Sequence, residues 1–214
     1  MNEPTRATDR PSAPPWRRPK WVFGALMLVT AGFAAYTSGR LLAPGPELAG
    51  TVLEAPQQVG ELAFDRAPDG ARVTLGAVAE EADWTLVFFG FVDCPDVCPL
   101  TMTRLADTVR DLDRGSALRV AMVTVDPEQD DPARLGAYVR GFHEEFVGLT
   151  GSNEDVATAA RRFFVGYNQA SGTIVHTESV ALVDRSGRLR AVYGQGSLPE
   201  LTHDLEAILN GRRL

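Results

Sequence analysis

Two cysteines, Cys94 and Cys98, are the residues of this chain whose type and spacing most clearly allow chemistry. They are the only cysteines in 214 residues, and they lie in the segment FFGFVDCPDVCPL with three residues between them. Such a pair could form a structural disulfide, act as a redox couple or supply two sulfur ligands to a metal. A chain of this length with 44% apolar residues can bury a core without a crosslink, so the pair is available for chemistry.

The spacing and the neighbours of the pair weigh these uses against one another. Thioredoxin-type redox enzymes use Cys-x-x-Cys, so this pair departs from the usual motif although a disulfide remains feasible. Asp93 and Asp96 bracket Cys94, and negative neighbours disfavour a free thiolate while they favour a bound cation. Two thiolates are soft ligands that suit copper. A structural zinc site would need four ligands, and the chain has no further cysteine and only three histidines.

His176 is the histidine best placed to complete a metal site with the two sulfurs. It stands directly before the apolar segment SVALVD, in a loop that faces the helix after the cysteines in a thioredoxin-like sheet. Thioredoxins place a cis-proline there, and this chain has no proline between Pro132 and Pro199. A solvated loop histidine is the ordinary alternative. His143, at a helix end, and His203, on a polar helix face, are expected at the surface.

The elements that must position these residues alternate between strands and helices. Apolar, β-rich runs predict strands at 84–91, 118–125 and 146–151. Helical periodicity predicts helices just after the cysteines and at 131–142, 153–164 and 197–209. Hairpins are expected over 61–75, around an Asp-Gly turn, and over 178–194. This order indicates an α/β, thioredoxin-like fold: a central mixed sheet flanked by helices, with an N-terminal β-hairpin.

Local signals refine this picture. Asn153 is expected to cap its helix, and Ser197 with Glu200 is expected to form a capping box. The cysteines fall at the C-terminal end of a central strand, where α/β sheets usually carry their sites.

A stretch of 19 uncharged residues between Lys20 and Arg40 predicts a membrane anchor. A helix over 21–39 would span about 28 Å, close to the thickness of the hydrocarbon core. The expected organisation is a cytoplasmic basic tail (1–20), a transmembrane anchor (21–39), a linker (40–56) and a thioredoxin-like domain (57–214). A cleaved signal peptide is the alternative. Both place the domain outside the cytoplasm, where disulfides can persist.

The charge of the chain is unevenly distributed. Basic residues gather before the anchor, whereas the whole chain has a formal net charge of −7, so the domain is acidic. Nucleic-acid binders need a basic face for phosphates, and nucleic acid is therefore not an expected partner.

The segment FFGFVDCPDVCPLTMTRL closely resembles the signature of the Sco/SenC family, in which Cys-Pro-Asp-Val-Cys-Pro follows an apolar strand. The segments VTVDPEQDDPARLGAYVRGFHEEFVGLTG and HTESVALVDRSGRLRAVYG are similar to two further blocks of that family. The resemblance covers most of 55–210. It implies a membrane-tethered, thioredoxin-like copper-binding domain whose ligands for Cu(I) or Cu(II) are Cys94, Cys98 and His176.

The resemblance also implies a role in assembling the dinuclear copper centre of cytochrome c oxidase subunit II. The protein would deliver copper, reduce the target's cysteines through a Cys94–Cys98 redox pair, or do both, with its domain on the periplasmic side of a bacterial inner membrane. Its implied partners are subunit II and another periplasmic copper chaperone or thiol reductant. The resemblance favours a metallochaperone over an enzyme and leaves a thiol-disulfide reductase activity open.

Three rival functions remain open. The first is a thiol-disulfide oxidoreductase without a metal role. The second is an enzyme of peroxiredoxin type, which is disfavoured because Phe91, not threonine, stands three residues before Cys94. The third is a structural disulfide, which would stabilise little across so short a loop.

One departure from the family concerns the residue before the histidine. The family commonly has Asp there, and this chain has Val175. An aspartate could orient the imidazole from behind. Asp126 and Asp96 are the candidates for such supporting groups. For Asp126, at the end of the second central strand, a turn-forming Asp-Pro role is the alternative.

Overall fold

The computed structural model describes residues 47–112, 117–168, 175–176, 178–212 and 214, with Met27, Val29, Thr30 and Phe33 before them. Two compact units divide the chain, Met1–Pro46 and Glu47–Leu214. In the first unit the four described residues are helical, and the Thr30 hydroxyl donates to the Met27 carbonyl at 3.0 Å. No helix among the described residues combines the length and the hydropathy that a membrane crossing requires. The anchor predicted at 21–39 falls mostly outside these residues.

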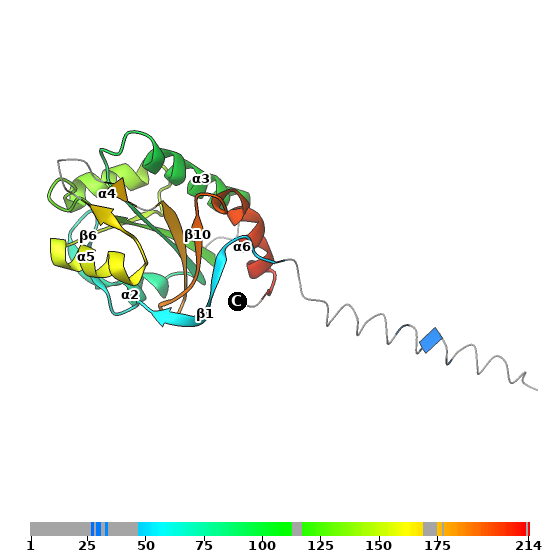
Figure 1. Ribbon diagram of the computed structural model, residues 1–214. Helices are drawn as coiled ribbons and strands as arrows, with labels where there is room; N and C mark the ends of the chain where they lie inside the picture. Colours follow the sequence, from blue (N-terminus) through cyan, green and yellow to red (C-terminus); the bar gives the residue numbers. More distant parts are fainter. Residues whose placement is uncertain are drawn as a thin grey trace, which may run out of the picture. The chain divides into compact units, whose positions relative to one another are not determined.

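A mixed eight-stranded sheet forms the centre of the second unit (Figure 1). Its strands are β1 Thr51–Gln58, β2 Ala63–Arg66, β3 Ala71–Thr74, β4 Trp84–Gly90, β5 Leu118–Thr124, β6 Val147–Thr150, β9 Ser179–Asp184 and β10 Arg188–Gly194. They lie in the order β1-β10-β9-β4-β5-β6-β2-β3, and a separate pair joins β7 (Tyr167–Asn168) to β8 (Val175–His176). The central strands β4, β5 and β6 are parallel, whereas β9 runs antiparallel to β4.

Helices cover both faces of this sheet (Figure 1). They are α2 Leu75–Ala79, α3 Val97–Leu112, α4 Pro132–Arg140, α5 Asn153–Arg162 and α6 Leu201–Leu209, the last preceded by a 3-10 turn, η3 Leu198–Glu200. Side chains of α3, α4 and α6 share one buried cluster with Phe88 and Val180. Side chains of α2 and α5 share the other with Val87 and Ala181. Neighbouring residues of β4 and of β9 therefore point to opposite faces, as strand geometry requires.

The predicted α/β order is confirmed in its main parts. The runs at 84–91 and 118–125 form β4 and β5, whose residues are almost all buried because helices cover both sides. The Asp-Gly hairpin forms β2 and β3, and Gly70 takes the left-handed conformation, with φ of 72°, that its turn requires.

The last six residues of the linker predicted at 40–56 belong instead to β1, which spans Thr51–Gln58. This strand pairs antiparallel with β10, with Thr51 opposite Val192. The register shifts between Val52 and Gln57, and such an irregular edge strand tolerates the proline at position 56. The buried Asp204 carboxylate fixes the backbone just before β1, since it accepts the N–H of Ala49 at 2.7 Å.

Two predicted helix caps are also wrong. Ser152, not Asn153, caps α5: its hydroxyl accepts the Asp155 N–H at 3.1 Å, and the Asp155 carboxylate accepts the Ser152 N–H at 3.2 Å. Ser197 makes no capping bond, and its hydroxyl instead donates to the Gly194 carbonyl at 3.2 Å. A 3-10 turn follows Ser197, so α6 begins only at Leu201 and the predicted box has no helix to cap.

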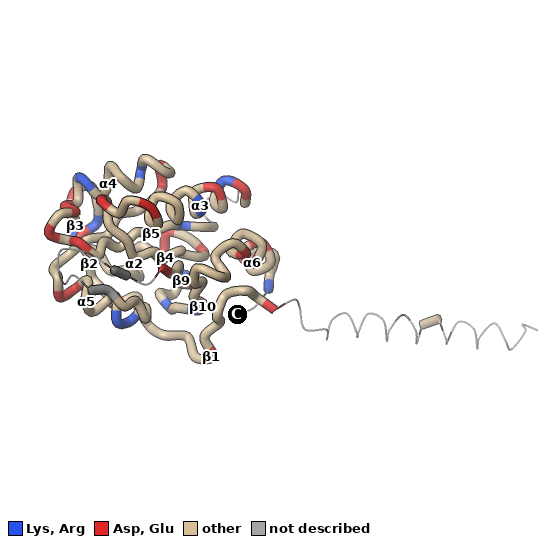
Figure 2. Tube along the Cα trace, turned by 45° about the horizontal axis from the view of Figure 1, so that its top comes forward, with Lys and Arg blue, Asp and Glu red and all other residues tan. Residues whose placement is uncertain are grey.

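Basic and acidic residues are mixed over the second unit. Figure 2 shows Lys and Arg positions interspersed with Asp and Glu positions along the chain. Many of them pair: Arg72 bridges Asp65 at 3.1 Å and Asp155 at 2.9 Å. Because such pairs are largely exposed, each contributes little to stability.

Candidate metal centre

Cys94 and Cys98 lie where β4 ends and α3 begins. The backbone N–H of Cys98 donates to the Cys94 sulfur at 3.4 Å, and the Cys94 N–H donates to the Phe91 carbonyl at 3.3 Å. The two sulfurs are not joined in a disulfide. Cys98 is fully buried, whereas Cys94 is partly exposed. The structure therefore brings both thiols to one helix start, where the helix dipole favours anionic sulfur.

Gly90, the last residue of β4, makes room for the buried thiol. A Cβ at this position would lie 3.0 Å from the Cys98 sulfur and 2.7 Å from Cε1 of Phe88. Both separations are shorter than ordinary van der Waals contact, so a side chain here would displace one of these groups. Glycine allows the strand and the first turn of α3 to approach closely.

Burial sets the protonation of the groups around the sulfurs. It is the main cause that raises the pKa of the Cys98 thiol, and the hydrogen bond with Cys94 adds to it. The hydroxyl of Tyr138, on α4, is enclosed without a hydrogen-bond partner among the described residues. Burial, and next the two nearby cysteines, raise the pKa of this phenol as well. The apolar surroundings thus keep Cys98 protonated until a cation or an oxidant displaces the proton.

Buried Asp130 fastens the loop that carries the first cysteine. One of its carboxylate oxygens accepts the Val92 N–H at 3.0 Å and the Thr124 hydroxyl at 2.7 Å. The other accepts from Arg134 at 3.3 Å, and Arg134 also pairs with Asp93. The ends of β4 and β5 are therefore joined to α4 through one carboxylate. Sequence reasoning missed Asp130, although a carboxylate just after a neighbouring parallel strand was a usable signal.

The two predicted supporting aspartates occupy turns. The Asp126 carbonyl accepts the N–H groups of Gln129 at 3.1 Å and Asp130 at 2.9 Å, which is the turn-forming role of an Asp-Pro pair. Asp96 is exposed, and its carbonyl accepts the Leu100 N–H at 3.3 Å in the first turn of α3. That either carboxylate supports the metal ligands stays a prediction.

Only the backbone of His176 is described, and it pairs with the backbone of Tyr167 in the β7–β8 ribbon. Its side chain lies outside the described residues. Among the side chains that are described, His, Cys, Asp and Glu form no group of three that could hold a metal ion. The ligand role of His176 therefore stays a prediction. The other histidines lie as expected: His143 follows α4, where its Nδ1 accepts the Glu145 N–H at 3.3 Å, and the His203 side chain is 67% exposed on α6.

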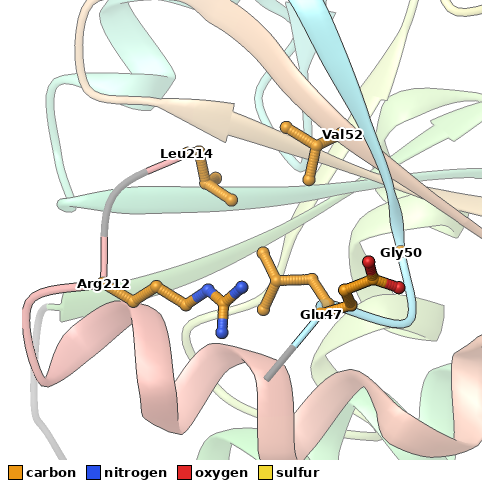
Figure 3. Close-up of a pocket in the computed structure, with 6 residues that line it drawn as sticks. Glu47, Gly50, Val52, Arg212 and Leu214 are labelled. Carbon is orange, nitrogen blue, oxygen red and sulfur yellow. The ribbon is translucent and has the colours of Figure 1, made fainter. Parts of the chain in front are cut away.

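A pocket of about 350 Å³ lies between the start of β1 and the end of the chain (Figure 3). The residues that line it are Glu47, Leu48, Gly50, Val52, Arg212 and Leu214. None of the predicted site residues is among them, so the cysteine pair and this pocket are separate features.

Known proteins resemble this chain over most of its second unit. A family model described as SCO1/SenC matches residues 68–210, more than half of the chain and the whole segment from β3 to α6. Protein SCO2 homolog, mitochondrial, of Mus musculus is 36% identical over 126 residues, which cover 55% of this chain and 49% of that protein. The chain thus spans about half the length of the curated relatives it matches.

Solved structures share the fold. Apo Sco1 from Thermus thermophilus is 35% identical, with a TM-score of 0.65 over 77% of this chain and 96% of that chain. Arabidopsis thaliana ScoI, solved with copper bound, is 27% identical, with a TM-score of 0.63 over 74% of this chain and 98% of that chain. The resemblance inferred from the cysteine motif is confirmed, together with the thioredoxin-like fold. The chain belongs to the SCO1/SenC family.

Proposed function

We propose that this chain binds copper through Cys94, Cys98 and His176 and serves in assembling the dinuclear copper centre of cytochrome c oxidase subunit II. The observation that carries the proposal is the hydrogen bond from the Cys98 N–H to the Cys94 sulfur, 3.4 Å long, which holds both sulfurs at the first turn of α3. Two adjacent sulfur donors suit copper, which prefers soft ligands. The copper-bound relatives from Arabidopsis thaliana and Bradyrhizobium japonicum, each 27% identical to this chain, support the same assignment.

His176 is the proposed third ligand. Its backbone lies three residues before Ser179, the first residue of β9, and β9 pairs with β4, the strand that leads to the cysteines. A neutral imidazole completes a three-coordinate set with two thiolates. Asp126 and Asp96 are proposed to support these three ligands through their negative charges. Neither carboxylate is buried in the core.

Copper titration of the reduced full-length chain tests the proposal. Sulfur-to-copper charge-transfer absorption should appear with Cu(II) in the wild type and disappear in Cys94→Ser and Cys98→Ser. His176→Ala should weaken binding and change the spectrum, whereas His203→Ala, which alters an exposed histidine, should do neither. A wild type that binds no copper would disprove the proposal. An unchanged spectrum in His176→Ala would show that the third ligand is misassigned.

A second candidate, thiol-disulfide exchange with the cysteines of subunit II, is favoured by one observation. Cys94 is partly exposed and Cys98 is fully buried, which is the asymmetry expected of an attacking and a resolving thiol. The two functions separate in one variant. His176→Ala should bind copper more weakly and keep its reductase activity toward an oxidised subunit II peptide if exchange is the function.

The proposed location is a bacterial inner membrane, with residues 21–39 as anchor and the domain on the periplasmic side. The uncharged stretch and its basic flank support this topology. Membrane fractionation tests it: the full chain should sediment with membranes, and a chain without residues 1–40 should not. Recovery of the full chain in the soluble fraction would contradict the anchor.

A further inference from the structure

Glu178 is a carboxylate that strand register brings to the cysteine site. In the antiparallel pair of β4 and β9, Phe88 lies opposite Val180. Continued by two residues past this last pair, the register sets Gly90 level with Glu178, the residue just before β9. Phe88 and Val180 both pack in the buried cluster on the α3 face. Since side chains alternate along a strand, Glu178 is directed to that same face, which also carries Cys98.

Gly90 shows how close this position is to the buried sulfur. A Cβ on Gly90 would lie 3.0 Å from the Cys98 sulfur, so Glu178 and Cys98 occupy neighbouring points on one face of the sheet. The electrostatics agree with this placement. After burial and the influence of Cys94, the charge of Glu178 also raises the pKa of the Cys98 thiol.

Gln195 holds the Glu178 carboxylate in place. The pairing of β9 with β10 sets Ser179 opposite Gly194, so the next residues, Glu178 and Gln195, face each other. The Gln195 amide donates to the Glu178 carboxylate, as this register requires. An amide donor fixes the carboxylate without neutralising it, so the negative charge remains available to a cation nearby.

We propose that Glu178 supplies a negative charge that shifts the preference of this site from Cu(I) toward Cu(II). The inference rests on the copper binding proposed above. Among the described side chains, Glu178 forms no group of three with Cys94 and Cys98 that could hold one ion, so we assign it a role through its charge and not as a ligand. A fixed negative charge stabilises a divalent ion more than a monovalent ion at the same position.

Competition titrations of the full chain with chelators for Cu(II) and for Cu(I) test this inference. In Glu178→Gln the ratio of the Cu(II) affinity to the Cu(I) affinity should fall on the order of tenfold. Glu178→Asp keeps the charge and should keep most of the ratio. The difference between wild type and Glu178→Gln should shrink as salt is added, since ions screen a charge effect and not a change of shape.

Glu206→Gln is the matched control, because it removes the same charge from an exposed position on α6. Helix α6 contacts α3 through a 2.8 Å hydrogen bond between Thr202 and Thr108. Thr108 lies ten residues after Cys98, about 15 Å along the helix, so the Glu206 variant should leave the ratio unchanged.

The outcomes separate the two proposals. If the wild type binds copper and Glu178→Gln keeps its ratio, the inference about Glu178 is wrong and the proposed copper function stands. An equal fall in Glu206→Gln would also overturn the inference, because the net charge of the domain would then be the cause. A wild type that binds neither ion would overturn both.

Discussion

The backbone N–H of Cys98 donates to the sulfur of Cys94, so the two thiols meet at the start of α3 and yet have different surroundings. Cys98 packs with Met102 and Leu105 in the buried cluster on the α3 face, while Cys94 lies at its border and is partly exposed. One sulfur is therefore accessible to a partner protein, and the other is held in the core.

This difference predicts unequal reactivity of the two thiols. With iodoacetamide near pH 8, Cys94 in the Cys98→Ser variant should react at least about tenfold faster than Cys98 in Cys94→Ser, since alkylation needs an accessible thiolate. Burial both shields the Cys98 sulfur and raises the pKa of its thiol. Mass spectrometry of the modified fraction against time gives the two rates. Denatured in urea, both variants should react alike; equal rates in the folded proteins would contradict the prediction.

Gly90→Ala should disturb the buried cysteine. The added methyl would meet the Cys98 sulfur at 3.0 Å and the Phe88 ring at 2.7 Å, so it overpacks the junction of β4 and α3. The expected loss in the free energy of unfolding is about 1–3 kcal/mol. Urea denaturation of the reduced protein measures it. Gly196→Ala is the control, because a Cβ there meets no atom within 4 Å. Equal stability of the two variants would refute the overpacking.

Much of the fold could be predicted from local sequence patterns. Short windows of the sequence show the apolar runs of β4 and β5 and the helical spacing of apolar residues in α3. These patterns also place the cysteines between β4 and α3. The edge strand β1 could not be predicted this way. It lies in the segment APGPELAGTVLEAPQQVG, whose Pro, Gly and small residues predict a linker. Its strand form depends on pairing with β10, more than 100 residues away in the chain.

The residues of the candidate site also differ in whether local sequence predicts them. The sulfur pair lies within one short motif and could be predicted, whereas Asp130 and Glu178 join the site through strand neighbours. Glu178 depends on the register of β9 against β4, which a single sequence does not specify. The predicted cap of α5 was wrong by one residue. The capping box begins at Ser152, one residue before the predicted cap, and several nearby polar residues satisfy the same sequence pattern.

Asp130→Asn should destabilise the loop that precedes Cys94. One Asp130 oxygen accepts from the Val92 N–H and the Thr124 hydroxyl and the other accepts from Arg134, whereas an amide in its place has only one acceptor oxygen. The expected loss in the free energy of unfolding is about 1–3 kcal/mol, with faster alkylation of Cys94. Urea denaturation and the alkylation assay measure these effects.

Asp131→Asn is the control for this change. The Asp131 side chain caps α4 by accepting the Arg134 N–H at 2.8 Å, and asparagine caps helices about as well as aspartate. The same substitution one residue later should therefore leave both readouts near those of the wild type. If the two variants behave alike, the buried carboxylate does not fasten the loop.

Asp184 predicts how stability depends on pH. Burial alone would raise the pKa of this carboxyl, but bonds from Ser186, Arg190 and the Arg188 N–H outweigh burial and hold the pKa below its ordinary value. Because the folded-state pKa is the lower one, the stabilisation is complete above the unfolded-state value of about 4 and is lost as the pH falls through the folded-state value.

Asp184→Asn should therefore lower the free energy of unfolding by about 1–3 kcal/mol at pH 7. Its difference from the wild type should begin to narrow below about pH 4, where the carboxyl becomes protonated in the unfolded wild type, and should vanish once the folded-state carboxyl is protonated as well. Urea denaturation at a series of pH values measures this difference, and Asp83→Asn, at a position 62% exposed, provides the flat reference. A gap that stays constant down to pH 3 would mean that packing, and not the charge of Asp184, stabilises the β9–β10 turn.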